Sequence, residues 1–452
     1  AHIQRTAGQI EDLYPLSPMQ EGMLFHSLYG SDSRIYTTQL ICELHGYLNE
    51  DLLEKAWQAV IDAHAVLRTG FEWKAVGEPV QVVRRSVKVR LNREDWKHLS
   101  REEQEQNLEE YLRQDHEQEF DLKQPLLMRL VIIRTADDEN LFIWTSHHLL
   151  LDGWSLPIVL KDVLTAYESL RRREQAARVR PARSYRDYIT WVKKQDLREA
   201  EVFWRQLLKG FVSPNPLGAS RLRLNGDSGY AEEQVQLSRF ATARLQEFAQ
   251  QHQLTQNTVV EGAWALLLSS HAEQDDVIFG VVVSGRSAEV AEVESMVGLF
   301  INTLPVRAKI TAEAELISWL KQLQAQQVEI GQHEYTPLAQ VQGWSEVEAG
   351  KPLFESIFLF ENYPVGSMAD VYGDLRVGRV RSIERSNYPL TVWAIPGREL
   401  VLKIGYDTRR FDAEWISQLL RDYQRLLEQI PEALCIKTLL AAKKQKMHKM
   451  SC

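Results

Sequence analysis

The sequence predicts an α+β fold, because strand-like and helix-like segments are mixed along the chain without the strict alternation of a parallel α/β sheet. The chain has 452 residues. This length exceeds the usual limit of one hydrophobic core, so we expect two lobes, each an α+β sandwich. Hydrophobic residues make up 44% and charged residues 25% of the chain, a balance typical of globular proteins with sizeable cores.

The elements follow from the spacing of apolar residues and from capping residues. In the first half we predict two strands and three helices, the first helix capped by Asn49: strand Gln39–Gly46, helix Asn49–Leu67, helix Glu105–Glu117, strand Leu141–Thr145 and a helix from Ser155 onward. In the second half, Phe211–Gly229 holds too many prolines and glycines for a regular element. It is followed by helices Ala241–Gln251 and Thr255–Ser270 and by strand Val277–Val283.

The domain boundaries are predicted from shifts in composition. An Arg-rich polar stretch with Pro181 interrupts the helical pattern between Arg171 and Arg183, where we place the lobe junction. The expected domains are therefore 1–180 and 181–438. Residues 439–452 resemble a linker to a following domain.

Charge, hydropathy and cysteine usage exclude several classes of function. The net charge of −9 argues against broad nucleic-acid affinity. No apolar run reaches membrane-spanning length and the first residues lack a signal-peptide pattern, so we expect no membrane contact and a cytoplasmic location. Cys42, Cys435 and Cys452 have no paired spacing, which favours neither a disulfide framework nor a zinc site.

The most informative stretch is Ser146–Ser155, in which two adjacent histidines end an apolar strand and Asp152 and Gly153 precede a helix. Catalytic groups are often held on such turns. Neighbouring strand residues point to opposite faces, so only one of His147 and His148 is expected to meet substrate. A metal site would need a third ligand on the same face, and we expect none.

The pattern His-His-x-x-x-Asp-Gly over His147–Gly153 resembles the signature of condensation domains of non-ribosomal peptide synthetases. Six further segments resemble the other motifs of that family, in order: Tyr14–His26, Ala63–Phe71, Tyr185–Trp191, Ser284–Arg286 with Met296–Pro305, Tyr335–Leu338 and Arg385–Leu390. The resemblance implies two lobes like chloramphenicol acetyltransferase, forming a V-shaped pseudo-dimer around a central tunnel. Donor and acceptor peptidyl carrier proteins would each send in a phosphopantetheine arm, and an adenylation domain would adjoin. We expect no cofactor bound by the domain itself.

The implied activity is acyl transfer: the α-amine of an acceptor aminoacyl thioester attacks a donor aminoacyl or peptidyl thioester, forming an amide bond. No Ser or Cys lies in a nucleophile-elbow pattern near the motif, in keeping with a reaction that needs no covalent enzyme intermediate. We predict that His148 contacts the reacting amine, as a base or as a positioning group. Gly153 either admits close approach of substrate or forms a tight turn.

Supporting roles are assigned to other motif residues. A carboxylate beside apolar residues needs a counter-charge, and the family pattern implies that Arg286, from the other lobe, supplies it for Asp152. His147 and Arg68 are expected to support the site, Arg68 through an interlobe or core-edge ion pair. Residues expected to line the tunnel or contact substrate are Trp154, Ser155, Asn302, Ser386, Asn387 and Tyr388. Gln20 and Glu21 either face the tunnel or pack.

Several alternatives remain open at this stage. An epimerisation domain shares the His motif but continues with Val-Ser-Trp-Arg, where this chain has Trp154–Pro157. A heterocyclisation domain would carry an Asp motif in place of the histidine pair. A non-catalytic carrier-protein docking scaffold and a stand-alone acyltransferase using coenzyme A are the other possibilities. The identities of the joined amino acids, the L or D preference for the donor and the oligomeric state do not follow from these motifs.

Overall fold

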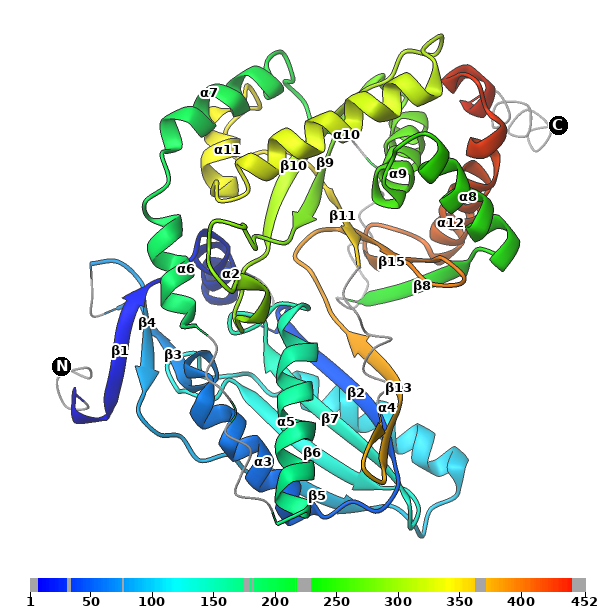
Figure 1. Ribbon diagram of the computed structural model, residues 1–452. Coiled ribbons are helices and arrows are strands. Elements are labelled where there is room, and N and C mark those ends of the chain that lie inside the picture. Colours follow the sequence, from blue (N-terminus) through cyan, green and yellow to red (C-terminus); the bar gives the residue numbers. More distant parts are fainter. Residues whose placement is uncertain are drawn as a thin grey trace. The chain divides into compact units, whose positions relative to one another are not determined.

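The computed structural model describes residues 7–30, 34–74, 77–173, 179, 183–215, 217, 229–361 and 371–440 (Figure 1). The chain divides into two compact units. The first comprises residues 1–195, 285–301 and 363–385, and the second comprises 196–284, 302–362 and 386–452. This division differs from the expected single cut after residue 180, because two later segments return to the first unit.

The main sheet of the first unit has six strands, in the spatial order β12 (Val371–Tyr372), β13 (Leu375–Ile383), β2 (Thr37–His45), β7 (Glu139–His147), β6 (Met128–Arg134) and β5 (Leu91–Asp95). The β5–β6 pair is parallel and the other pairs are antiparallel. The central strand β7 pairs along its length with β2 and β6, so that its last residue, His147, is held in register opposite Thr37.

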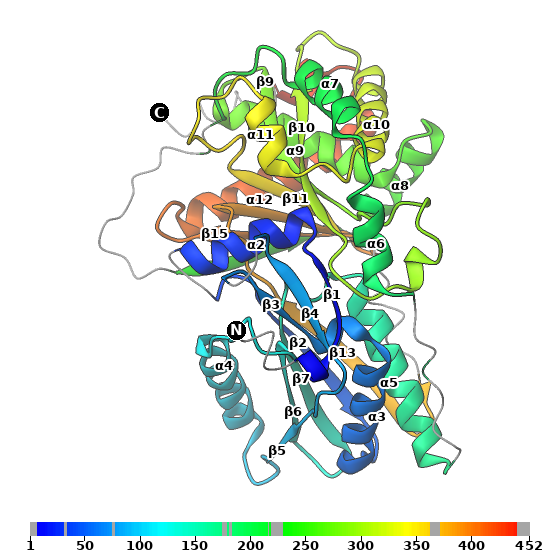
Figure 2. The same cartoon turned by 90° about the vertical axis from the view of Figure 1, so that its left-hand side faces the viewer.

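Helices cover both faces of this sheet (Figure 2). On one face, α3 (Glu50–Ala63) and α5 (Ser155–Arg171) pack against Phe142 and Trp144, and Trp57 of α3 stacks on Phe142 at 5.7 Å between ring centroids. On the other face, α4 (Arg101–Glu117) packs against Ile143. The alternation of strand residues thus fills two cores, as expected for a sheet buried on both faces.

A smaller sheet in the same unit has the order β1 (Ile10–Pro15), β4 (Val80–Arg84) and β3 (Thr69–Glu72). Two helices belong with it: α2 (Pro18–Tyr29) follows β1, and α6 (Tyr185–Val192) contacts it. Ser17 and Gln20 form a capping box at the start of α2, and Pro18 opens the helix, which explains why the Pro-containing turn leads directly into a helix.

The second unit also contains a six-stranded sheet, ordered β10 (Asn302–Lys309), β9 (Asp276–Val283), β11 (Ser356–Phe360), β14 (Leu390–Ile395), β15 (Val401–Asp407) and β8 (Tyr230–Gln236). Its helices are α7 (Leu197–Leu208), α8 (Arg239–Gln251), α9 (Gln256–Ala272), α10 (Leu316–Gln332), α11 (Leu338–Trp344) and α12 (Ala413–Gln429). The helix α9 is buried from Thr258 to Ser269 and forms the centre of this unit's core.

The expected α+β class is confirmed, and the differences from the expected elements have local causes. The helix expected from Glu105 begins at Arg101, because Ser100 and Glu103 form a capping box ahead of the apolar pattern. The helix expected to end at Leu67 ends at Ala63 and is followed by a 3-10 turn, Ala65–Arg68. Asn49 does cap it, accepting from the Leu52 N–H at 3.1 Å.

Two further expectations concern the second half. The linker expected from residue 439 cannot begin there, since Leu439 is buried in the core of the second unit. Residues 441–452 lie outside the described residues, as does most of 211–229. Among the helices of the described ranges, none is long and apolar enough to cross a membrane.

Candidate functional site

The histidine motif lies on the turn between β7 and α5 in the first unit. The strand ends at His147, and α5 begins at Ser155, as the sequence pattern predicts. The backbone of the turn is tied down at its start: the His147 N–H donates to the Leu127 carbonyl at 2.9 Å, and the His148 N–H donates to the Tyr36 carbonyl at 2.8 Å. The two imidazoles are therefore presented from a fixed backbone.

His147 is buried, with 2% of its surface exposed. Its Nδ1 accepts a hydrogen bond from the Leu149 N–H at 3.2 Å, so the proton of the neutral ring belongs on Nε2. The ring packs edge-on to Phe120, with 6.2 Å between centroids. Burial, together with the neighbouring His148, lowers the pKa of His147 from 6.5 to about 3. His147 is therefore neutral at physiological pH and acts as a packing and hydrogen-bonding group.

His148 differs from its neighbour in exposure. The residue is only partly buried, although its Nδ1 is buried and, like Nε2 of His147, has no hydrogen-bond partner among the described residues. Of the two imidazoles, His148 is the one that solvent or a substrate can reach. This contrast agrees with the expected division of roles within the pair, and contact of His148 with substrate stays a prediction.

Asp152 is the centre of a buried hydrogen-bond network. One carboxylate oxygen accepts from the Ser155 N–H at 2.9 Å, the Ser155 hydroxyl at 2.7 Å and Arg286 Nη2 at 3.2 Å. The other accepts from the Phe300 N–H at 3.0 Å. The Asp152 side chain is 0% exposed and that of Arg286 2% exposed. A buried carboxylate with four donors and a counter-charge is compensated for its lost hydration.

Arg286 uses the rest of its guanidinium to hold its own segment. Nη1 donates to the carbonyls of Val293 at 2.6 Å and Met296 at 3.0 Å, and the group lies 4.1 Å from the centre of the Phe300 ring. The ion pair expected with Asp152 is present. The expectation that Arg286 comes from the other lobe is wrong, because residues 285–301 cluster with the first unit.

Two glycines of this segment make close contacts that a Cβ would prevent. Gly285 has φ +64°, and a Cβ there would lie 1.8 Å from the Phe300 carbonyl oxygen. A Cβ on Gly298 would lie 2.3 Å from the Tyr185 ring. The Gly298 carbonyl accepts from the Asp152 N–H at 3.1 Å, and the Gly298 N–H donates to the Ser155 hydroxyl oxygen at 3.1 Å. Glycine is thus required at both positions, because the backbone of Gly285 lies against the Phe300 carbonyl and that of Gly298 against the Tyr185 ring.

The contacts of two further residues of the first unit bear on their expected roles. The expectation that Ser155 lines a tunnel is wrong, because Ser155 is 0% exposed and its hydroxyl is consumed by the Asp152 network. Arg68, expected to support the site through an interlobe or core-edge ion pair, pairs with Glu11 at 2.6 Å and donates to the carbonyls of Ile61 and Arg84. These contacts tie α3 to the small sheet and match the alternative of a core-edge ion pair.

Gly153 and Trp154 lie between the Asp152 network and α5, and both are partly buried. Trp154 occupies the position before the first residue of α5. Their predicted contacts with substrate stay predictions.

The other expected substrate residues belong to the second unit. Asn302 is 5% exposed and its amide donates to the carbonyls of Glu334 at 2.8 Å and Thr336 at 2.7 Å, so it holds a loop and does not line a cavity with a free amide. Ser386 shares a hydrogen bond with Thr391 at 2.6 Å.

Asn387 is the exposed member of this group. Tyr388 stacks on Phe354 with 5.5 Å between centroids, and burial raises the pKa of its phenol. Both residues stay predictions as substrate contacts.

Residues outside the short motif also hold the turn, and sequence reasoning gives them less weight. Gln20 of α2 is 0% exposed and donates to the Leu149 carbonyl at 2.9 Å. Behind His147, Arg129 lies 4.2 Å from the centre of the Phe120 ring and pairs with buried Asp115 at 2.7 Å. The sequence signal that could identify such supporting residues is a polar side chain at a position that the helix pattern assigns to the buried face.

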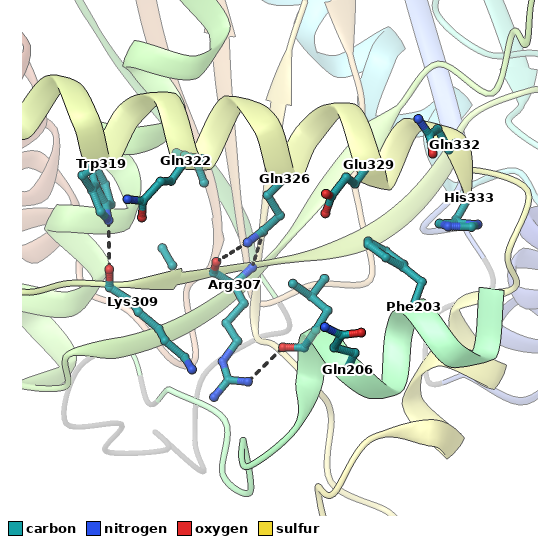
Figure 3. A pocket seen from close by; sticks show the side chains of 13 residues that line it. Phe203, Gln206, Arg307, Lys309, Trp319, Gln322, Gln326, Glu329, Gln332 and His333 are labelled. Atoms are coloured by element: carbon teal, nitrogen blue, oxygen red, sulfur yellow. Dashed lines mark hydrogen bonds between the residues drawn. The ribbon is translucent and has the colours of Figure 1, made fainter. Parts of the chain in front are cut away.

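A separate cavity of about 620 Å³ lies in the second unit between α7, β10 and α10 (Figure 3). Several of its polar groups are already satisfied: Gln326 bonds both backbone groups of Arg307 at 3.1 and 2.9 Å, and the Trp319 indole donates to the Lys309 carbonyl at 2.9 Å. These bonds cap the outer edge of β10. None of the sequence-predicted site residues lines this cavity.

The described part of the chain contains no group of three His, Cys, Asp or Glu residues placed to hold a metal ion. Asp152, the carboxylate of the histidine turn, is bonded instead to Arg286 and to neighbouring N–H and O–H groups.

Comparison with known proteins decides the family. The family described as "Condensation domain" matches this chain over residues 10–444. The chain belongs to the condensation-domain family of non-ribosomal peptide synthetases. Among curated relatives of this condensation domain is a component of the linear gramicidin synthase of Brevibacillus parabrevis, 47% identical over 425 residues, which cover 93% of this chain and 5% of that protein. The chain thus spans about a twentieth of that relative's length.

Solved structures agree with the fold of the condensation domain. The X-domain from teicoplanin biosynthesis has a TM-score of 0.80 at 22% identity, with 93% of this chain and 95% of that chain covered. The first condensation domain of the calcium-dependent antibiotic synthetase has a TM-score of 0.79 at 16% identity, with 94% and 98% covered. These likenesses show that the chain shares the fold of those two domains.

Proposed function

We propose that this condensation domain forms an amide bond between two carrier-bound substrates. A donor aminoacyl or peptidyl thioester and an acceptor aminoacyl thioester would each arrive on the phosphopantetheine arm of a carrier protein. The observation that carries the proposal is the partly exposed His148 residue on a turn where the neighbouring His147 is buried and the Asp152 carboxylate is buried and paired. Family membership supplies the class of reaction, and this turn supplies a group able to take part in it.

The reaction balances without a further reagent. The acceptor nitrogen attacks the donor carbonyl carbon, the C–N bond forms, the C–S bond breaks, and the proton lost by the nitrogen is taken up as the thiolate becomes a thiol. The thioester is already activated, so the domain needs to supply approach geometry and a route for the proton. Hydrogen-bond donors near the developing oxyanion would lower the barrier further.

His148 can serve this reaction in two ways. As a general base it would contribute about 10²- to 10⁴-fold to the rate. An α-amine has a pKa of about 8 in model compounds and is partly neutral at pH 7, so positioning of the amine through a hydrogen bond would also suffice. His147 cannot substitute, because it is buried and its Nδ1 is already bonded to Leu149.

The test is an assay with two loaded carrier proteins, scored by intact mass for the dipeptidyl thioester. The wild-type domain should produce it, and His148→Ala should lose at least about 100-fold in rate. His148→Gln keeps a hydrogen-bonding group but removes the base, so a rate near wild type would indicate positioning and a rate near His148→Ala would indicate base catalysis.

The matched control is His98→Ala, which removes a histidine from the loop between β5 and α4. It should behave as the wild-type domain in rate and in melting temperature. An inverted α-carbon in the absence of dipeptide would show epimerisation instead, and carrier binding without any product would show a docking scaffold. Either outcome refutes the proposed condensation.

A further inference from the structure

The Gln20 carboxamide is completely buried and makes hydrogen bonds with every part of its amide group. Gln20 is 0% exposed. Its Oε1 accepts from the Ser17 N–H at 2.9 Å and from Gln81 Nε2 at 2.9 Å. Its Nε2 donates to Gln81 Oε1 at 3.1 Å and to the Leu149 carbonyl at 2.9 Å. The amide is therefore saturated with two donated and two accepted bonds.

The orientation of this amide is fixed by its partners. The Ser17 N–H is a donor only, so it requires an oxygen at the position of Oε1, and the nitrogen must then face Leu149. Gln81 lies on β4, is itself 0% exposed, and donates to the Pro15 carbonyl at 3.0 Å. The capping box of α2 and the small sheet thus hold Gln20 in one rotamer.

The bond from Gln20 reaches the turn next to the reacting group. Leu149 directly follows His148 and is 0% exposed. Its N–H donates to His147 Nδ1 and its carbonyl accepts from Gln20, while the His148 N–H donates to Tyr36. Without Gln20, the buried Leu149 carbonyl would lose this partner, and the peptide following His148 would be held less firmly.

We propose that Gln20 is a positioning residue for His148, acting through the Leu149 carbonyl. This inference rests on the proposed function, in which His148 meets the acceptor amine. It assigns a chemical role to a side chain of α2 that lies 128 positions earlier in the sequence than His148. A displacement of about 1 Å in a reacting group can cost about 100-fold in rate, so one lost hydrogen bond can matter far more for kcat than for folding.

The test uses Gln20→Met, which keeps the length of the side chain and removes both amide functions. We expect kcat for dipeptide formation to fall about tenfold to a hundredfold, while KM for each loaded carrier stays within about threefold. A second readout is the rate at which diethyl pyrocarbonate modifies His148, measured by peptide mass spectrometry. That rate should change at least about twofold, because it follows the orientation and exposure of the ring without requiring any turnover.

The matched control is Gln58→Met in α3 of the same unit. Gln58 also holds two backbone groups, the Val87 carbonyl at 2.8 Å and the Val89 N–H at 3.1 Å, and makes no contact with the histidine turn among the described residues. Gln58→Met should leave kcat and the modification rate of His148 near wild type. An equal loss of kcat in the two variants, or an unchanged kcat in folded Gln20→Met, would overturn the proposal.

Gln20→Glu keeps the test decisive if the Met variant does not fold. When ionised, the introduced carboxylate could only accept hydrogen bonds and would repel the Leu149 carbonyl oxygen. When protonated, the carboxyl group can donate a hydrogen bond to that oxygen. The ratio of variant to wild-type kcat should therefore rise as the pH is lowered, and a ratio independent of pH would overturn the proposal. A wild-type domain that makes no dipeptide would instead refute the proposed function, and the modification rate of His148 would then decide the positioning role alone.

Discussion

Removal of either partner of the Asp152–Arg286 pair should strongly destabilise the fold of the first unit. Asp152 accepts four hydrogen bonds and Arg286 donates to two further carbonyls, all within a buried network. Stranding one charge of such a pair costs about 3 to 5 kcal/mol, which is a large share of the roughly 5 to 15 kcal/mol that keeps a domain folded. Asp152→Ala and Arg286→Met should therefore each lower the free energy of unfolding by about 3 to 5 kcal/mol.

The double variant carries the decisive information. Two independent losses would sum to roughly 6 to 10 kcal/mol, but the double variant strands no charge. We therefore expect it to recover at least about 2 kcal/mol of that sum, as coupled residues do in double-mutant cycles. The measurement is urea unfolding followed by the fluorescence of the 12 tryptophans.

An exposed pair provides the control for this cycle. Lys97 and Asp137 lie 2.8 Å apart with 36% and 92% of their side chains exposed, and Asp137→Asn should leave the unfolding curve unchanged. The reasoning fails if Asp152→Ala is soluble, as stable as wild type and inactive, since the carboxylate would then act directly in the reaction.

Three further predictions concern buried groups. Burial lowers the pKa of His147 from 6.5 to about 3, so the folded state binds fewer protons than the unfolded state. The free energy of unfolding should therefore fall as the pH drops below about 6.5. His147→Phe should lessen that fall in urea titrations between about pH 4 and 7. Burial raises the pKa of Glu261 from 4.5 to about 7. The contribution of this group to stability should therefore be greatest below about pH 4.5 and decline by about 3 kcal/mol as the pH rises through 7. Glu261→Gln should abolish this decline, and an unchanged dependence of the unfolding free energy on pH in the variant would show that Glu261 titrates normally. Gly285→Ala should lower the melting temperature sharply because its Cβ would overlap the Phe300 carbonyl, whereas Gly343→Ala, with open space around it, should not.

Much of the site is predictable because its signals are local. The two histidines end an apolar strand and Asp152 precedes a helix, which are features of a few neighbouring residues. The ion pair with Arg286 follows from the family's motif order. The contrast between buried His147 and partly exposed His148 also agrees with the opposite directions of adjacent strand residues.

Long-range partners are not predictable from such signals. The pairing of β13 with β2 joins residues far apart in the sequence, such as Arg376 and His45, and no periodicity within either strand specifies its partner. The membership of 285–301 in the first unit has the same origin. Polarity within a motif suggests that Ser155 and Asn302 face substrate, but each instead satisfies buried backbone or carboxylate groups. Sequence patterns show that a residue is polar, not which group it is bonded to.

The return of two later segments to the first unit limits how the domain can be recombined with relatives. A hybrid joined after residue 195 would take 285–301 and 363–385 from a different parent. The arginine that pairs with Asp152 would then come from the other parent, and so would the strand that pairs with β2 in the place of β13. Hybrids that transfer all three stretches together should retain solubility more often than those divided by a single crossover.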